Sequence, residues 1–272
     1  MNKRINTLYF SATDTTRKIV TSIAEELAKH REKGKTIRNM DFTLPEGRKA
    51  AVSYEEDDVV IIGIPVYAGR VPNVLLKYLN SIQGNGALAV AIVVYGNRNY
   101  DDALIELKDI LELDGFKVIA AAAFIGEHAF SKILAQNRPD EKDSLFSREF
   151  AKQIDKKMTT QVEIQPIVVN GNKPYRNYYM PRDRQGNPVD IRRVTPKTNS
   201  NCTDCKHCVN ICPMGSIDSE DPSKLIGICI KCGACVKKCP VNAKYYEDQD
   251  YLRHKSELEI EFARRREPEL FI

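Results

Sequence analysis

All eight cysteines of this 272-residue chain lie between Cys202 and Pro240. They form two copies of the pattern C-x2-C-x2-C-x3-C-P, and the second copy follows the first at an offset of 27 residues. Three thiolates at this spacing can hold three corners of an iron-sulfur cube. The fourth cysteine of each copy, held extended by the proline behind it, points toward a second cube. The pattern therefore predicts two four-iron clusters that exchange one ligand each.

This exchange defines two ligand sets. We expect cluster I on Cys202, Cys205, Cys208 and Cys239. We expect cluster II on Cys229, Cys232, Cys235 and Cys212.

Disulfides and zinc sites are the alternative interpretations of the cysteines. Disulfides need an oxidising compartment, and the N-terminal residues lack the apolar core of about 7 to 15 residues that a secretion signal requires. Zinc ribbons use paired C-x2-C units across longer spacers, without a C-P after each copy. The cysteine region instead resembles the bacterial two-cluster 4Fe-4S ferredoxins, at every defining position of both copies. The resemblance implies a small α+β domain, placed at residues 199–247, and one-electron transfer.

Composition limits the remaining possibilities. The 41 Lys and Arg against 37 Asp and Glu give a formal charge of +4, which makes no general case for nucleic acid or membrane surfaces. No window approaches about 18 consecutive apolar residues. Because eight thiolates must stay reduced, we expect a cytoplasmic protein. The length suits one full-sized domain and a small one.

The N-terminal part alternates apolar segments with segments of helical period. The apolar segments are too continuous to face water, which favours a parallel doubly wound α/β sheet with ligands beyond the carboxyl ends of its strands. We expect five strands and five helices, with the last helix reaching residue 158. The expected strands are Ile5–Phe10, Thr36–Phe42, Val59–Ile64, Ala87–Tyr95 and Lys117–Ile125.

Three loops follow these strands at the ligand-binding edge. In the first, Ser11 and Thr13 precede a helix that opens at Thr15, so hydroxyls, free N–H groups and the helix dipole converge as for a phosphate; an ordinary helix cap is the alternative. The second and third loops carry Tyr67 and Tyr100 beside small residues, which suits stacking on a planar heterocycle. The candidate cofactor residues are Ser11, Thr13, Asp14, Thr15, Thr16, Pro65, Tyr67, Ala68, Gly69, Gly96, Asn97, Arg98 and Tyr100.

With these loops, residues 1–160 resemble a flavodoxin, whose phosphate loop is commonly [ST]-x-T-G-x-T. Ser11, Thr13 and Thr16 match, whereas Asp14 stands at the glycine position. Its carboxylate would lie near a phosphate and could satisfy helix N–H groups in its place. The segments PVYAGRVP, VYGNRNYDDAL and GEHAFS are more similar to the fused flavodoxin-ferredoxin proteins. That resemblance implies FMN, with His128 near the flavin edge; a hydrogen-bonded structural histidine is the alternative.

Two segments lie outside the two domains, and the C-terminal one suggests no chemistry. Residues 161–198 form a proline-rich arm that is basic with interleaved tyrosines, which we expect to lie over the first domain; single-stranded nucleic acid is a less favoured partner. Residues 248–272 form a tail, helical over 251–267, with an apolar end. Docking of this end onto the body or onto a second subunit would bury it, so a homodimer stays open.

The predicted function is electron transfer between FMN and two 4Fe-4S clusters, to or from a redox protein or a small-molecule donor or acceptor. No acid-base pair or activated nucleophile stands out. One alternative is a two-cluster ferredoxin whose first domain has lost flavin and only docks to partners. Another is a flavin reductase that uses NAD(P)H or a small substrate, although no G-x-G-x-x-G fingerprint follows any strand.

Overall fold

The computed structural model describes residues 3–29, 36–160 and 165–272. At its centre lies a sheet in the order β2-β1-β3-β4-β5-β8, parallel except for β8. The five parallel strands have the order of the flavodoxin-like doubly wound fold, which confirms the predicted fold class. The strands are β1 (Arg4–Tyr9), β2 (Arg38–Asp41), β3 (Asp58–Pro65), β4 (Leu88–Tyr95), β5 (Lys117–Ile125) and β8 (Glu269–Phe271).

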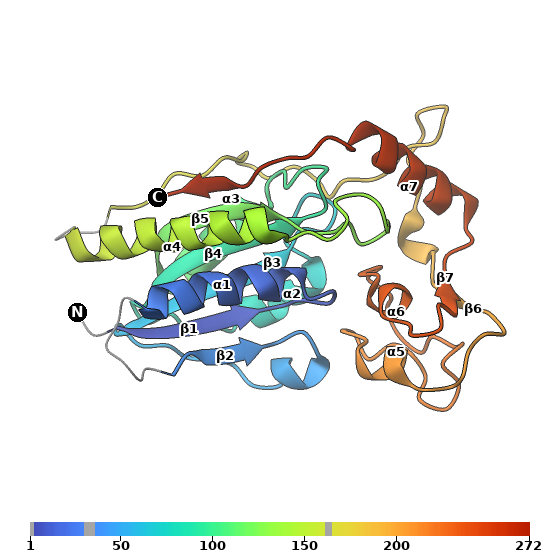
Figure 1. Ribbon diagram of the computed structural model, residues 1–272, viewed down its shortest axis with the longest axis horizontal. Helices are drawn as coiled ribbons and strands as arrows, with labels where there is room; N and C mark the ends of the chain where they lie inside the picture. Colours follow the sequence, from blue (N-terminus) through green and yellow to red (C-terminus); the bar gives the residue numbers. More distant parts are fainter. Residues whose placement is uncertain (1–2, 30–35, 161–164) are drawn as a thin grey trace.

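Helices cover both faces of this sheet (Figure 1). Two pack on one face, α1 (Thr15–Lys29) and α4 (Glu141–Thr160), and two on the other, α2 (Asn73–Leu79) and α3 (Ala103–Leu113). Every residue of β4 is buried because both of its faces are covered, which explains its continuous apolar run. β3 and β4 pair in register from Val59 opposite Leu88 to Pro65 opposite Val94, so their carboxyl ends lie level.

The expectation of five helices in this domain was wrong for the described residues, which form four α-helices here. The connection between β2 and β3 holds only a short 3-10 helix, η1 (Pro45–Arg48). Gly47 packs so closely on the end of β2 that a Cβ would lie 2.4 Å from the Asp41 carbonyl oxygen. The chain turns back onto the sheet at this point and has no room to extend a helix.

The basic arm lies over the loops of the sheet module. Tyr179 donates its backbone N–H to the Ala68 carbonyl oxygen at 2.8 Å, and the Tyr178 hydroxyl donates to the Val71 carbonyl oxygen at 2.8 Å. Residues 161–164, where we placed the start of the arm, lie outside the described residues. The arm ends in η2 (Ile191–Arg193) and β6 (Lys197–Thr198).

The cysteine module repeats its own structure at the 27-residue offset of its sequence. Two short helices, α5 (His207–Asn210) and α6 (Ala234–Lys237), occupy equivalent positions. Each follows a residue in the left-handed region, Lys206 at φ +56° and Gly233 at φ +75°. β6 pairs with β7 (Lys244–Tyr245) and closes the module.

The C-terminal tail returns to the sheet. Its helix α7 (Gln249–Glu261) begins after Asp248, whose side chain accepts the Tyr251 N–H, and it ends six residues before the predicted end at 267. β8 then pairs with residues 121–123 of β5, so the apolar end of the tail docks onto the body of its own chain (Figure 1). None of the helices in the described ranges has the length and apolar character needed to cross a membrane.

Candidate functional site

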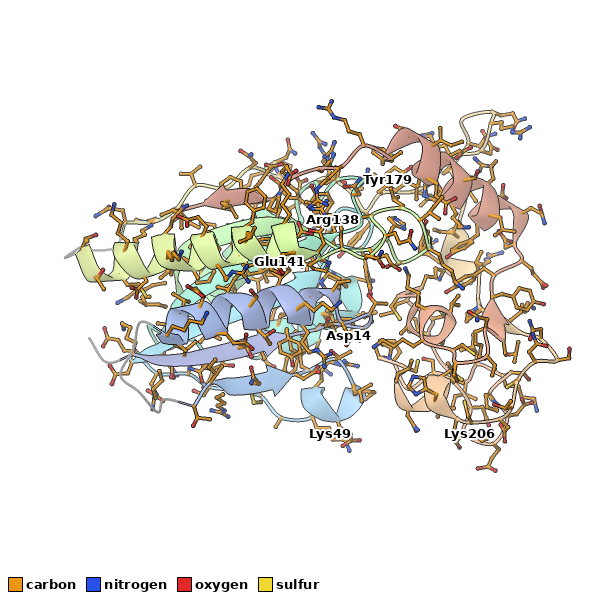
Figure 2. All side chains as sticks on the ribbon, viewed as in Figure 1. Asp14, Lys49, Arg138, Glu141, Tyr179 and Lys206 are labelled. Atoms are coloured by element: carbon orange, nitrogen blue, oxygen red, sulfur yellow. The ribbon has the colours of Figure 1, made fainter. Side chains whose placement is uncertain are left out.

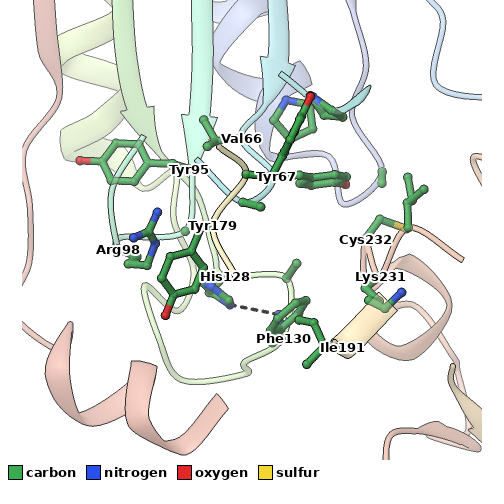
Figure 3. Close-up of a pocket in the computed structure, with 18 of the residues that line it drawn as sticks. Val66, Tyr67, Tyr95, Arg98, His128, Phe130, Tyr179, Ile191, Lys231 and Cys232 are labelled. Carbon is green, nitrogen blue, oxygen red and sulfur yellow. Dashed lines mark hydrogen bonds between the residues drawn. The ribbon is translucent and has the colours of Figure 1, made fainter. Parts of the chain in front are cut away.

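A cavity of about 530 Å³ lies beyond the carboxyl ends of β1, β3, β4 and β5, where the three predicted loops meet. Its other walls come from the arm, from α7 and from the second cysteine copy. Figure 3 shows Arg98 and Tyr179 on one side of this cavity and Lys231 and Cys232 on the opposite side. The cavity therefore connects the sheet module to the cysteine module.

The first loop brings three threonines to the cavity wall, one of them with an unsatisfied hydroxyl. Thr13, Thr15 and Thr16 line the cavity, and Thr16 is only 1% exposed. The Thr16 Oγ1 has no hydrogen-bond partner among the described residues, and an unsatisfied buried hydroxyl costs about 1–3 kcal/mol. A phosphate at the N-terminus of α1 would satisfy it. Ser11 lies behind the wall, where its Oγ accepts the Arg17 N–H at 3.0 Å.

Asp14 has a left-handed backbone, with φ +66°, a conformation that favours glycine. Its carboxylate pairs with Lys238 of the second cysteine copy at 2.8 Å and with Arg17 at 3.3 Å. Figure 2 shows Asp14 at the end of α1 that faces the cysteine module. The carboxylate is thus held by two cations, and the helix N–H of Arg17 is satisfied by Ser11.

The second loop is a tight turn. Ala68 and Gly69 both have positive φ, and two hydrogen bonds of 3.1 Å join the Tyr67 and Arg70 backbones across them. A side chain at position 69 would collide with Asp101 Oδ2 at 2.2 Å, so Gly69 serves the turn and does not line the cavity. Pro65, Tyr67 and Ala68 do line it.

Tyr67 also lies beside the second cysteine copy. Burial raises the pKa of its phenol well above the usual value, and the nearby Cys232 and Cys229 thiols raise it further. The phenol is therefore neutral, and its ring is available for stacking.

Some residues of the third loop line the cavity, and others contact the C-terminal tail. Gly96 and Arg98 line the cavity, and the Arg98 guanidinium lies 4.4 Å from the centre of the Tyr179 ring. The Asn97 amide donates instead to the Phe262 carbonyl oxygen at 2.6 Å.

The structure also places Tyr100 away from the cavity. Its hydroxyl donates to the Glu269 carboxylate of β8 at 2.6 Å, and its ring packs in the core against Tyr95. Tyr100 is therefore not placed for the predicted stacking. Asn97, which was a candidate cofactor residue, does not line the cavity either. Both residues secure the C-terminal tail, whose return to this edge has no signal in the third loop.

His128 lines the cavity and is also hydrogen-bonded. Its Nδ1 accepts the Phe130 N–H at 3.1 Å (Figure 3). Burial lowers the pKa of His128 to about 3, and the charges of Lys237, His254 and Arg98 lower it further. The ring is therefore neutral near pH 7 and carries its proton on Nε2, as a donor.

Several cavity residues lie outside the predicted set. Tyr179 and Ile191 come from the arm, His254 from α7 and Lys231 from the second cysteine copy. The Tyr179 and His254 rings stack with centroids 5.8 Å apart. The interleaved tyrosines of the arm were the available signal, but their partner surface could not be identified without the fold.

The four predicted ligands of cluster II lie together. Burial raises the pKa of the free Cys232 thiol to about 12, and Cys229 and Cys212 are among the neighbours that raise it. Burial also raises the pKa of the Cys235 thiol, and the Cys232, Cys229 and Cys212 thiols raise it further. The Ser216 N–H donates to Cys212 Sγ at 3.4 Å.

The first cysteine copy is more open to solvent. Cys202 and Cys205 are exposed, and the Ala243 N–H donates to Cys239 Sγ at 3.2 Å, as Ser216 does to Cys212. In the parts of the chain that the structure describes, no group of three or more His, Cys, Asp or Glu side chains is close enough to hold a single metal ion. A cubane is held differently, by one thiolate at each iron corner.

Lys244 lies between the two cysteine sets. Burial raises the pKa of Cys208 and of Cys235, and the Lys244 ammonium opposes the rise in both. Its charge also acts on Cys239, where backbone N–H groups outweigh burial and lower the pKa. The ammonium is buried and donates to Thr198 Oγ1 at 2.7 Å.

Comparisons with known proteins found matches to separate parts of the chain. Residues 201–244 match the family model of the 4Fe-4S dicluster domain. No curated protein matches the chain. Similar solved structures include a flavodoxin from the domain Archaea, with 15% identity over 57% of this chain and 97% of that one and a TM-score of 0.39.

Two further solved structures are similar to the first part of the chain. A Fusobacterium nucleatum flavodoxin bound to flavin mononucleotide has 19% identity over 57% of this chain and 98% of that one, with a TM-score of 0.38. An NADH:FMN oxidoreductase in its apo form has 12% identity over 60% of this chain and 94% of that one, with a TM-score of 0.42.

The chain thus joins a flavodoxin-like domain, defined by its strand order, to a 4Fe-4S dicluster domain, defined by its two cysteine copies. This combination supports a role in electron transfer and implies a redox partner.

Proposed function

We propose that the cavity binds FMN and that the chain passes electrons between this flavin and two 4Fe-4S clusters, to or from an external redox partner. One observation carries the proposal: the phosphate-type loop and the cysteines Cys229 and Cys232 line the same cavity. FMN, when bound, supplies the exchange between two-electron and one-electron transfer.

Different cavity residues would bind different parts of the flavin. The Thr13, Thr15 and Thr16 loop would hold the phosphate, with the unsatisfied Thr16 hydroxyl as one donor. Tyr67 would stack on the heterocycle, and the apolar wall around it would exclude water. His128 would offer its Nε2–H as a donor at the same edge of the sheet.

The ligand sets predicted from the sequence give the relay an order. Cys229 and Cys232 belong to the proposed cluster II and line the cavity, whereas the exposed Cys202 and Cys205 belong to the proposed cluster I. Electrons would pass between the cavity and cluster II, then cluster I, then a partner at the exposed side. The N–H groups of Ser216 and Ala243 at the cysteine sulfurs would raise the cluster potentials.

The contacts also support a division into four parts with the boundaries expected from the sequence: 1–160, 161–198, 199–247 and 248–272. The arm and the tail both bind the first part, through the Ala68 carbonyl and through the β5 edge. Their function would be to hold the cysteine module over the cavity.

The test is anaerobic purification with clusters intact, followed by iron and flavin assays and by a redox titration that follows both kinds of centre. We expect about eight iron atoms and about one FMN per chain. Cluster-loaded protein that contains no flavin and does not bind added FMN would overturn the proposal and favour the docking alternative. Rapid reduction of the bound flavin by NADH or NADPH would identify a reductase.

A further inference from the structure

We propose that Lys238 of the cysteine module binds the FMN phosphate, so that the phosphate site is completed only by both modules together. This inference rests on the proposed function, because it concerns the loop whose residues Thr13, Thr15 and Thr16 line the cavity. It assigns a binding residue outside the flavodoxin-like domain.

The position of Lys238 carries the inference. Its ammonium lies 2.8 Å from Asp14, inside the loop that precedes α1. Both side chains are about one third exposed, so the pair borders solvent and can rearrange. The buried Thr16 hydroxyl, which has no partner in the described residues, belongs to the same loop.

Charge explains why a cation is needed at this point. A flavodoxin-like phosphate loop can bind through backbone N–H groups and hydroxyls alone, but here Asp14 adds a negative charge beside the phosphate position. The Arg17 guanidinium already pairs with the Asp14 carboxylate at 3.3 Å. Lys238 would offset Asp14 and, by moving from its carboxylate toward the phosphate, supply a charge-assisted hydrogen bond.

The first cysteine copy indicates that the motif does not require a lysine before its fourth cysteine. At the 27-residue offset, Lys238 corresponds to Ile211, which packs against the core. The two side chains precede equivalent cysteines, Cys239 and Cys212, so an apolar residue is compatible with the motif. The lysine is therefore a feature of the second copy, which places it beside the Asp14 loop.

The neighbouring Lys237 provides an internal control. It bridges to Glu127 and donates to the Ser131 carbonyl oxygen at 2.6 Å, in the loop after β5. It thus joins the same two modules without approaching the Asp14 loop. Removing its charge tests the interface, whereas removing that of Lys238 tests the phosphate site.

The experiment compares FMN with riboflavin, which lacks the phosphate, on flavin-depleted full-length protein that retains its clusters. Dissociation constants come from quenching of flavin fluorescence, and iron content reports whether the clusters remain. Lys238→Gln should weaken FMN about tenfold and leave riboflavin unchanged, and Lys238→Arg should restore most of the loss. Lys237→Gln should affect FMN and riboflavin equally. The surface variant Lys224→Gln should affect neither.

A second background separates a direct contact from simple neutralisation of Asp14. If Lys238 binds the phosphate, Lys238→Gln still weakens FMN in an Asp14→Asn protein. If it acts only by neutralising the carboxylate, the effect disappears there and the proposal is overturned. Equal losses for FMN and riboflavin would also overturn it, whereas wild-type protein that binds neither flavin would instead refute the proposed function.

Discussion

The two cysteine copies have the same local structure and different surroundings. Gly233, before α6, lies so close to the loop after β5 that a Cβ would be 2.4 Å from the Ala129 carbonyl oxygen, and Ala234 is buried. Their counterparts in the first copy are Lys206 and His207, and His207 is exposed. The two copies thus share the same local backbone, while the residues between the cysteines differ where the second copy packs against the loop after β5.

This asymmetry also separates the proposed roles. The first copy contacts the sheet module through Arg48, which donates to the Pro213 carbonyl oxygen at 2.5 Å. The second copy forms the cavity wall and carries the Lys237 and Lys238 bridges to the sheet loops. This asymmetry is the basis of the proposed order, in which cluster II exchanges electrons with the cavity and cluster I with a partner.

The largest effect is expected when the equivalent cysteines of the two copies, Cys232 and Cys205, are removed one at a time. Cys232→Ala and Cys205→Ala should each lose about half of the iron and keep the flavin. The two variants should differ in the rate of electron exchange between the flavin and the remaining cluster. This rate should fall by orders of magnitude in the Cys232 variant alone. Iron assays and rapid-mixing absorbance under anaerobic conditions measure both effects, and equal kinetics in the two variants would contradict the relay order.

A smaller effect is expected from Lys244, which lies near thiols of both sets. A nearby positive charge stabilises the reduced, more negative cluster, and about 1.4 kcal/mol corresponds to about 60 mV for a one-electron couple. Lys244→Met should therefore lower both cluster potentials by roughly 60 mV or more. The larger shift is expected in cluster I, because two of the three thiols that Lys244 acts on, Cys208 and Cys239, belong to it and only Cys235 belongs to cluster II.

The structure provides controls for this measurement. Ile217 occupies the equivalent position of the first copy and is buried, so the fold accepts an apolar side chain there. The exposed Lys224, paired with Asp221, is a matched charge, and Lys224→Met should leave both potentials nearly unchanged. Anaerobic titration followed by electron paramagnetic resonance gives the potentials. A shift confined to one cluster would show that Lys244 does not act on both.

The fold was predictable because its signals are local. The apolar run of β4 follows directly from burial on both faces, and the 27-residue offset recurs in α5 and α6. The first loop was likewise recognisable from its hydroxyl residues, three of which line the cavity.

The parts that could not be predicted depend on contacts between distant segments. The side chains of Asn97 and Tyr100 bind the C-terminal tail more than 160 residues away in the chain. The charge of Asp14, read alone, suggested a conflict with phosphate, and only the fold places Lys238 beside it. In both cases the local pattern gave the correct loop and could not identify its partner.

The smallest expected effect concerns His128, which lies near Lys237 of the second copy. Its pKa is lowered to about 3 by burial and by nearby charges, including Lys237, whereas an unfolded histidine has a pKa of about 6.5. As the pH falls from about 7 to about 5.5, the unfolded chain binds a proton that the folded chain does not. The free energy of unfolding should therefore fall by about 1 kcal/mol because of this residue. In His128→Gln that loss should be absent, and denaturant unfolding at the two pH values measures it. The exposed His207→Gln, in the first copy, should keep the wild-type difference; if both variants behave alike, His128 is not held neutral by the packing of the second copy.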